Sequence, residues 1–276
     1  MADKYPNYRI QAGSVTDPSG RRRTSMESPV RSVVRDGAAG NAVGGAAVGA
    51  PGRPARRDYT AGPRRDGVDS HDVRRRWAER SGEYSPAYYA HYGPDETSES
   101  VRDILRQRLA RDASVLELGC SSGRHLSHLF DDGFGDLSGV ELNADAFDVM
   151  ADHYPDLWEA GTFYADAIED VVGDFDDDAF DAVYSVETLQ HIHPDAEWVF
   201  EEIARITGDL VVTVEIEDDA EDADRRKREG EPDVNYVREE VPLYYRDWKE
   251  VFEGLGLEQV EHRALKRDAV RAFRAR

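Results

Sequence analysis

Small residues and a carboxylate are spaced for cofactor binding between positions 115 and 129, which read VLELGCSSGRHLSHL. A short apolar run ends in a small-residue turn, and leucines then recur at helical spacing. Such a turn presents unpaired backbone N–H groups, and glycine has no Cβ to keep a ligand away from the main chain. The pattern Glu117-x-Gly119-x-Ser121-x-Gly123 is neither a dinucleotide fingerprint nor a phosphate loop. It suits a cationic or hydroxyl-rich ligand better than a pyrophosphate.

Two further carboxylates follow later apolar runs. Glu141 closes the run at 137–142, and Asp166, followed by Ala167, closes the run at 162–165. A carboxylate at a strand tip could accept hydrogen bonds from both hydroxyls of a ribose. Each acid alone could be an ordinary strand-end or loop charge. Together they would lie at the carboxyl ends of successive strands, the edge where open α/β sheets bind ligands.

This series of motifs resembles the class I S-adenosylmethionine-dependent methyltransferases, whose first motif is E/D-x-G-x-G-x-G. Ser121 stands where that family usually has its middle glycine, and the resemblance covers roughly residues 82–276. It implies S-adenosylmethionine as the cofactor and a Rossmann-like α/β fold. The sheet would have seven mostly parallel strands, helices on both faces and an antiparallel final strand. The implied cofactor-binding residues are Glu117, Gly119, Cys120, Ser121, Gly123, Glu141, Leu142, Asp166, Ala167 and Val186.

Strand-like and helix-like stretches alternate along the chain at intervals that favour a parallel sheet covered on both faces. Residues 215–231 are rich in charge and are expected to form a solvated insert. Strands are expected at 115–118, 137–142, 162–165, 180–186 and 210–214, with a final antiparallel pair at 257–265 and 269–273. Helices are expected at 99–110, 144–150, 197–206 and 248–255.

The loop after the fourth expected strand, residues 185–195, should carry the chemistry. The leaving group of methyl transfer is already activated by its positive charge, so the protein mainly aligns the acceptor and excludes water. A hydroxyl acceptor would need a base, for which His191 is the first candidate and Glu187 the second. A carboxylate acceptor would need positioning only. His191 could instead make a hydrogen bond at a helix start, and His-x-His-x-Asp is too weak a pattern for us to expect a metal.

Aromatic and basic residues on either side of the expected cofactor domain could bind the acceptor. In methyltransferases of this architecture a leading segment such as 77–112 covers the cofactor pocket. Tyr88 and Tyr89 in this segment are acceptor-binding candidates, although they could merely pack a helix onto the sheet. Tyr245 and Arg246 precede the last helix, and Arg246 could bind an anionic acceptor or lie on the surface.

Within the superfamily, the stretches LSGVELN and QHIHPDAEWVFEEIARI resemble small methyltransferases of surface-glycan and sugar biosynthesis. Haloarchaeal hexuronic-acid methyltransferases and pseudaminic-type enzymes belong to this group. The resemblance implies O-methylation of a sugar or glycan precursor, for example a hexuronic acid carboxylate converted to its methyl ester. Two alternatives remain open: a methyltransferase for another small molecule or lipid, and a non-catalytic binding protein of the same fold. The retained acids argue against the second.

Charge is unevenly distributed along the chain. The net charge is −22, with only 4 lysines beside 31 arginines and 57 acidic residues. Residues 1–80 carry a net charge of +7, and residues 81–276 one of −29. An acidic, lysine-poor composition is typical of a high-salt cytoplasm, where screening weakens self-repulsion, but an ordinary acidic enzyme is the alternative. Duplex nucleic acid is not an expected partner of the acidic part.

The composition predicts three regions: a disordered basic arm at 1–76, a helical acceptor segment at 77–112 and the cofactor-binding domain at 113–276. The arm could contact nucleic acid or the inner face of an anionic membrane, or be translated from upstream of the true start. Its Gly/Ala stretch is too weakly apolar to span a membrane, and we find no secretory signal. With Cys120 as the only cysteine, a cytoplasmic location is expected. The sequence does not indicate an oligomeric state.

Overall fold

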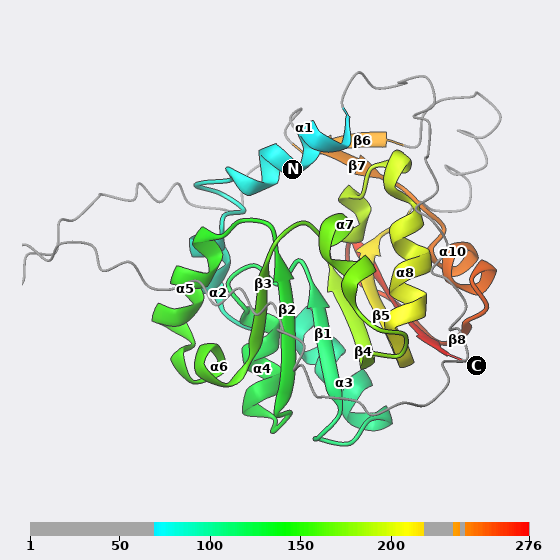
Figure 1. The fold of residues 1–276 in the computed structure, drawn as a ribbon, viewed down its shortest axis with the longest axis horizontal. Coiled ribbons are helices and arrows are strands. Elements are labelled where there is room, and N and C mark those ends of the chain that lie inside the picture. The colour runs from blue at the N-terminus through cyan, green and yellow to red at the C-terminus, as the bar shows by residue number, and fades with distance from the viewer. Residues whose placement is uncertain (1–68, 218–233, 238–240, 276) are drawn as a thin grey trace, which may run out of the picture. The chain divides into compact units, whose positions relative to one another are not determined.

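The computed structural model describes residues 69–217, 234–237 and 241–275. Seven of the described strands form one mixed sheet in the order β3-β2-β1-β4-β5-β9-β8 (Figure 1). The five strands from β3 to β5 are mutually parallel, and β9 runs antiparallel to both of its neighbours. The expected Rossmann-like fold, with its antiparallel final strand, is confirmed. The strands are β1 (Ser114–Leu118), β2 (Asp136–Glu141), β3 (Thr162–Ala165), β4 (Phe180–Val186), β5 (Thr207–Ile216), β8 (Glu258–Ala264) and β9 (Asp268–Arg274).

Helices cover both faces of this sheet (Figure 1). A hydrophobic core lies on each face of the sheet, because successive side chains along a strand point to opposite faces. Val115 of β1 packs among helices α3 to α6, whereas Leu116 packs among α7, α8 and α10. No helix in the described part of the chain has the length and apolar character needed to cross a bilayer. The helices are α1 (Ser70–Ala78), α2 (Pro86–Tyr92), α3 (Glu96–Arg108), α4 (Arg124–Asp131), α5 (Asp145–His153), α6 (Pro155–Ala160), α7 (Ile168–Val171), α8 (Trp198–Ile206) and α10 (Trp248–Gly254).

The structure departs from the sequence expectations at three places. The boundary expected at residue 76 falls inside α1, whose N-terminus is capped by Asp69. Two short strands that sequence patterns did not indicate, β6 (Val234–Val237) and β7 (Val241–Tyr244), pair as an antiparallel hairpin. The predicted start of the solvated insert, residue 215, is too early, because Glu215 belongs to β5 and is fully buried. Residues 218–231 of that insert and residues 1–68 of the expected arm lie outside the described residues.

The turn between β1 and α4 explains why small residues occur there. Gly119, Ser121 and Gly123 all have positive φ angles, a region that favours glycine. A Cβ on Gly119 would overlap the Thr188 side chain, so this glycine allows the β1 and β4 ends to approach closely. A Cβ on Gly123 would lie 2.8 Å from Cε of Met150 in α5. The positive φ and the close packing of α5 therefore both favour glycine at position 123.

We predict that Gly123→Ala destabilises the protein by about 1 to 2 kcal/mol, the cost of a left-handed conformation for a residue with a Cβ. Gly135→Ala is the control, because its added Cβ meets no atom within 4 Å and its φ is not positive. Urea unfolding of both variants measures the difference. Equal stability of the two variants would contradict the packing explanation.

Candidate cofactor and acceptor site

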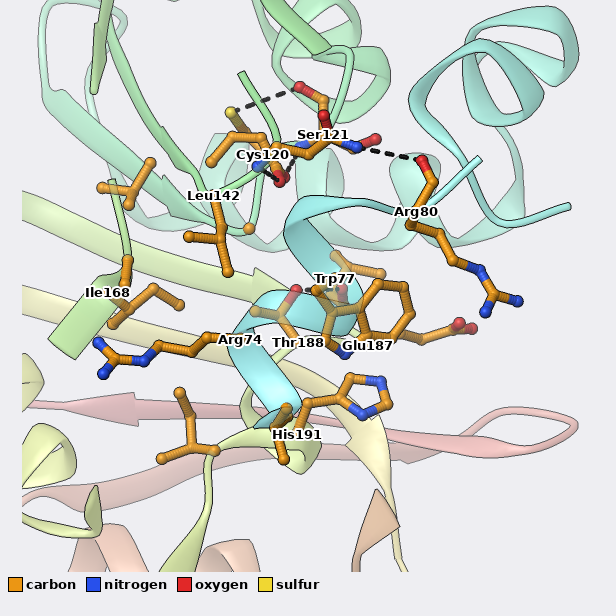
Figure 2. A pocket seen from close by; sticks show the side chains of 18 of the residues that line it. Arg74, Trp77, Arg80, Cys120, Ser121, Leu142, Ile168, Glu187, Thr188 and His191 are labelled. Atoms are coloured by element: carbon orange, nitrogen blue, oxygen red, sulfur yellow. Dashed lines mark hydrogen bonds between the residues drawn. The ribbon is translucent and has the colours of Figure 1, made fainter. Parts of the chain in front are cut away.

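A cavity opens at the carboxyl ends of β1, β2 and β4, and its empty space is about 1100 Å³ including the open mouth. Figure 2 shows Cys120 and Ser121 of the glycine turn at one end, His191 at the other, and Trp77 between them. The structure brings together most of the residues predicted from the sequence. Those that line the cavity are Gly119, Cys120, Ser121, Glu141, Leu142, Asp166, Ala167, Val186, Glu187, His191 and Tyr89.

Glu141, at the tip of β2, organises the turn. Its two carboxylate oxygens accept hydrogen bonds from the backbone N–H groups of Ser121 (2.8 Å) and Asn143 (2.7 Å). The Asn143 side-chain amide in turn donates to the Arg80 carbonyl at 3.2 Å, which ties the leading segment to β2. Burial raises the pKa of the Glu141 carboxyl, and the backbone hydrogen bonds oppose that rise. The carboxylate lies in the cavity wall, where it could also accept bonds from a ligand.

Asp166 and Ala167 follow β3 on the same side. The Asp166 backbone N–H donates to the Glu141 carbonyl at 3.1 Å, so the two strand tips lie side by side. The Asp166 carboxylate accepts the Ala167 N–H at 2.8 Å, and Asp166 is an exposed residue that lines the cavity. A polar acceptor beside a small buried residue is an arrangement that can receive one edge of a flat ring.

Two of the predicted cofactor residues lie behind the cavity wall. Glu117 is 1% exposed and is not one of the residues that line the cavity; it accepts a hydrogen bond from the Tyr184 hydroxyl at 2.9 Å. Burial raises its pKa well above the ordinary value. Gly123 is also absent from the lining and faces Met150. We therefore assign both residues a role in supporting the turn.

His191 lies in the cavity wall opposite the glycine turn. Its Nδ1 is 2.9 Å from the Pro242 carbonyl oxygen in β7, which can only accept, so Nδ1 carries the proton and Nε2 is an acceptor. The ring packs edge-on against Trp77, with 4.7 Å between centroids. Burial lowers the pKa of His191 to about 4. The imidazole is therefore neutral at physiological pH.

Glu187 lies next to this wall in a strained conformation, with φ at +49°. Its carboxylate faces Asp268 at the start of β9, and burial together with this neighbour raises the pKa of Asp268 to about 6. Glu187 also raises the pKa of Tyr89, an effect second to that of burial. The second predicted base thus lies in the cavity beside another acid, which sequence patterns did not indicate.

The two tyrosines predicted on the acceptor side have different positions. Tyr89 lines the cavity, and its ring lies 5.0 Å from the Arg124 guanidinium. Tyr88 is absent from the lining and packs in an aromatic cluster, 4.8 Å from the Tyr92 ring centroid. Burial and the hydrogen bond with Tyr92 raise the pKa of Tyr88 to about 12. Tyr89 alone of the pair remains a candidate for contact with an acceptor.

Arg246 and Tyr245 are placed away from the cavity, contrary to the expectation that they bind the acceptor. They border a separate surface hollow beside α8 and α10. The Arg246 side chain is 7% exposed and donates to the Glu197 carboxylate (3.1 Å) and the Ile192 carbonyl (2.7 Å). Its guanidinium also lies 5.2 Å from the Phe200 ring centroid. These bonds direct the cation into the protein.

Several residues that line the cavity were missed from the sequence. They come from α1 and the segment after it, together with the start of α4: Val73, Arg74, Trp77, Arg80, Arg124 and His125. Arg74 fixes α1 beside α7 through an ion pair with Asp170 at 2.8 Å. Arg124 pairs with Asp95 at 2.6 Å. The sequence signal that could have revealed α1 is Asp69, a helix N-cap residue that precedes Val73 and Trp77. The spacing of four positions between these two apolar residues is typical of one face of a helix.

Comparisons with known proteins agree with this architecture. Residues 115–209 match the family model of a methyltransferase domain. A curated relative from Streptomyces venezuelae, dTDP-3-amino-3,4,6-trideoxy-alpha-D-glucopyranose N,N-dimethyltransferase, is 34% identical over 71 residues. That match covers 25% of this chain and 30% of the relative, so it spans less than a third of the relative's length.

Two crystal structures share the fold. One is 1,6-didemethyltoxoflavin-N1-methyltransferase of Burkholderia thailandensis with bound S-adenosylhomocysteine: TM-score 0.52, 18% identity, covering 65% of this chain and 78% of that one. The other is magnesium protoporphyrin IX methyltransferase of Synechocystis PCC 6803, also with bound S-adenosylhomocysteine: TM-score 0.52, 13% identity, covering 74% and 93%. The described residues therefore have the Rossmann-like fold of class I methyltransferases.

The environment of His191 predicts a pH dependence of stability. The native state excludes the proton until the pH falls to about 4, whereas the unfolded chain binds it near 6.5. The contribution of neutral His191 to the free energy of unfolding is therefore present above pH 6.5 and is lost as the pH falls toward 4. Between neutral pH and about pH 5 the loss is about 2 kcal/mol. Urea unfolding at both pH values should therefore show a larger loss for the native protein than for His191→Asn, and equal losses would contradict this environment.

Proposed function

We propose that the chain is an S-adenosylmethionine-dependent methyltransferase acting on a small-molecule acceptor. The observation that carries this proposal is one cavity whose wall contains the glycine turn, Glu141 at the tip of β2 and Asp166–Ala167 after β3. The match of residues 115–209 to a methyltransferase domain supports it. So does the S-adenosylhomocysteine bound in both crystal structures of the same fold.

The donor and acceptor groups of the cavity fit this cofactor. Glu141 offers carboxylate oxygens suited to ribose hydroxyls, and Asp166 offers an acceptor suited to an exocyclic amine. Ala167 and Leu142 supply apolar wall on that side. Gly119, Cys120 and Ser121 line the cavity, so the main chain of the glycine turn forms part of the wall that would face the cofactor. S-adenosylmethionine would supply an activated methyl group, and the residues of this chain would orient it and exclude water.

We further propose that the reaction is O-methylation of a sugar or glycan precursor, with a carboxylate as the favoured acceptor. Arg80 and Arg124 line the cavity and could attract an anionic group in place of Arg246. His191 is neutral and could orient the acceptor through Nε2. With a hydroxyl acceptor, His191 or Glu187 would take the proton. A sugar amine is the second candidate, because the Streptomyces venezuelae relative is an N,N-dimethyltransferase of an amino sugar.

Removal of the Glu141 carboxylate tests the cofactor site. We expect Glu141→Ala to weaken S-adenosylhomocysteine binding at least tenfold, because a hydrogen bond to a charged group contributes about 1.5 to 3 kcal/mol. Isothermal titration calorimetry in high salt measures the affinity. Glu159→Ala, an exposed acid of α6, is the control and should bind like the native protein. Unchanged affinity in Glu141→Ala would reject this site, and no binding by the native protein would reject the cofactor.

Neutralisation of a cavity arginine tests the acceptor class. We expect Arg80→Gln to raise the KM for a uronic acid sugar about tenfold, because one charge-assisted hydrogen bond is lost, and to leave cofactor affinity unchanged. Arg75→Gln is the matched control, since Arg75 lies on exposed α1 surface and pairs with Asp72. Transfer of labelled methyl from S-adenosylmethionine measures both. Equal use of carboxylate and neutral sugars by the native protein would contradict an anionic acceptor.

A further inference from the structure

The loop that carries Glu187, Thr188 and His191 is anchored on one buried carboxylate. Glu215, in β5, is 0% exposed. Its Oε1 accepts hydrogen bonds from the Ser185 hydroxyl (2.7 Å) and from the backbone N–H groups of residues 188 (3.2 Å) and 189 (3.0 Å). Its Oε2 accepts the N–H of residue 190 at 3.2 Å. Three successive backbone N–H groups thus converge on one carboxylate, an arrangement that binds anions.

A second contact makes the anchor reciprocal. The Gln190 side-chain carbonyl accepts the backbone N–H of Ile216 at 2.8 Å, and Gln190 is itself buried. The end of β5 and the loop after β4 therefore hold each other at two adjacent positions. Thr188 extends from this anchor over Gly119, and His191 follows in the cavity wall. Both ends of the cavity consequently depend on the same loop geometry.

Arg246 holds the next part of the loop. Its guanidinium donates to the Ile192 carbonyl. Burial lowers the pKa of Arg246, and the charges of Glu197 and Glu215 oppose that lowering. Residues 188–190 thus donate to a buried anion, and residue 192 accepts from a buried cation. Glu215 and Arg246 therefore both hold the loop after β4, although neither residue lines the cavity.

We propose that Glu215 is a positioning residue of the methyltransferase site: its carboxylate fixes the wall formed by Glu187, Thr188 and His191. This inference rests on the proposed function. An amide cannot replace the carboxylate, because its NH₂ group would face donors in either orientation and leave a buried N–H without an acceptor. Glu217 follows the last residue of β5, and its carboxylate pairs with Arg271 at 2.6 Å. Glu217→Gln is therefore a matched control.

Hydrogen–deuterium exchange of the full-length chain at about pH 8 tests whether Glu215 anchors the loop. Burial raises the pKa of Glu215 to about 7, so most Glu215 carboxyls are ionised at this pH. In Glu215→Gln we expect at least tenfold faster exchange at residues 188–190, with β1 and β2 protected as in the native protein. The acceptor KM should rise at least tenfold while kcat falls less. Glu217→Gln should leave exchange in the loop and both kinetic constants unchanged.

Three outcomes would overturn the inference: unchanged exchange at residues 188–190 in Glu215→Gln, faster exchange throughout the sheet, or the same loop effect in Glu217→Gln. The exchange measurement needs no substrate. A native protein that binds no S-adenosylhomocysteine would therefore reject the proposed function, whereas the localised exchange result would still report on the anchor.

Discussion

Carboxylates buried where parallel strands end must be satisfied by donors from neighbouring segments, because an unpaired buried charge is strongly unfavourable. Three such groups organise this protein. Glu117 of β1 accepts from the Tyr184 hydroxyl, Glu141 of β2 from the N–H groups of the glycine turn and the loop after β2, and Glu215 of β5 from the loop after β4. Glu117 thereby joins β1 to β4, whereas the donors to Glu141 and most of those to Glu215 come from loops. The need for donors at Glu141 and Glu215 therefore fixes loops that form the cavity.

The leading segment completes the cavity through contacts of a different kind. Trp77 packs against His191, the Arg80 carbonyl accepts from Asn143, and Arg74 pairs with Asp170. These contacts join α1 and the segment after it to two loops and to α7 at the carboxyl edge of the sheet. Partly exposed ion pairs contribute little to stability. The aromatic packing and the hydrogen bond from the Asn143 side chain consequently contribute more to holding this segment over the site.

Sequence patterns predicted the sheet well, because buried parallel strands such as β4 are nearly continuous apolar runs. The bounds of β4 match the prediction, as do those of the partly exposed edge strand β3. Helix α1 was missed because it is rich in arginine and is stabilised by distant contacts. Glu215 was assigned to a solvated insert, and Arg246 to the acceptor site or the surface, since charge normally indicates exposure or a ligand. The partners that bury Glu215 lie 25 to 30 residues away in the chain. Such pairings depend on how the strands are ordered, which local patterns do not specify.

The low pKa of His191 bears on which acceptor the site suits. A general base is most effective when its pKa is near the working pH, and a pKa of about 4 is well below neutrality. Burial and the bond to Pro242 make His191 a fixed, neutral hydrogen-bond acceptor, which orients a group well but removes a proton poorly. A carboxylate acceptor has no proton to lose, and Arg80 and Arg124 lie in the same cavity. Under the proposed function, the low pKa of His191 is better suited to an acceptor that needs alignment and desolvation than to one that needs deprotonation.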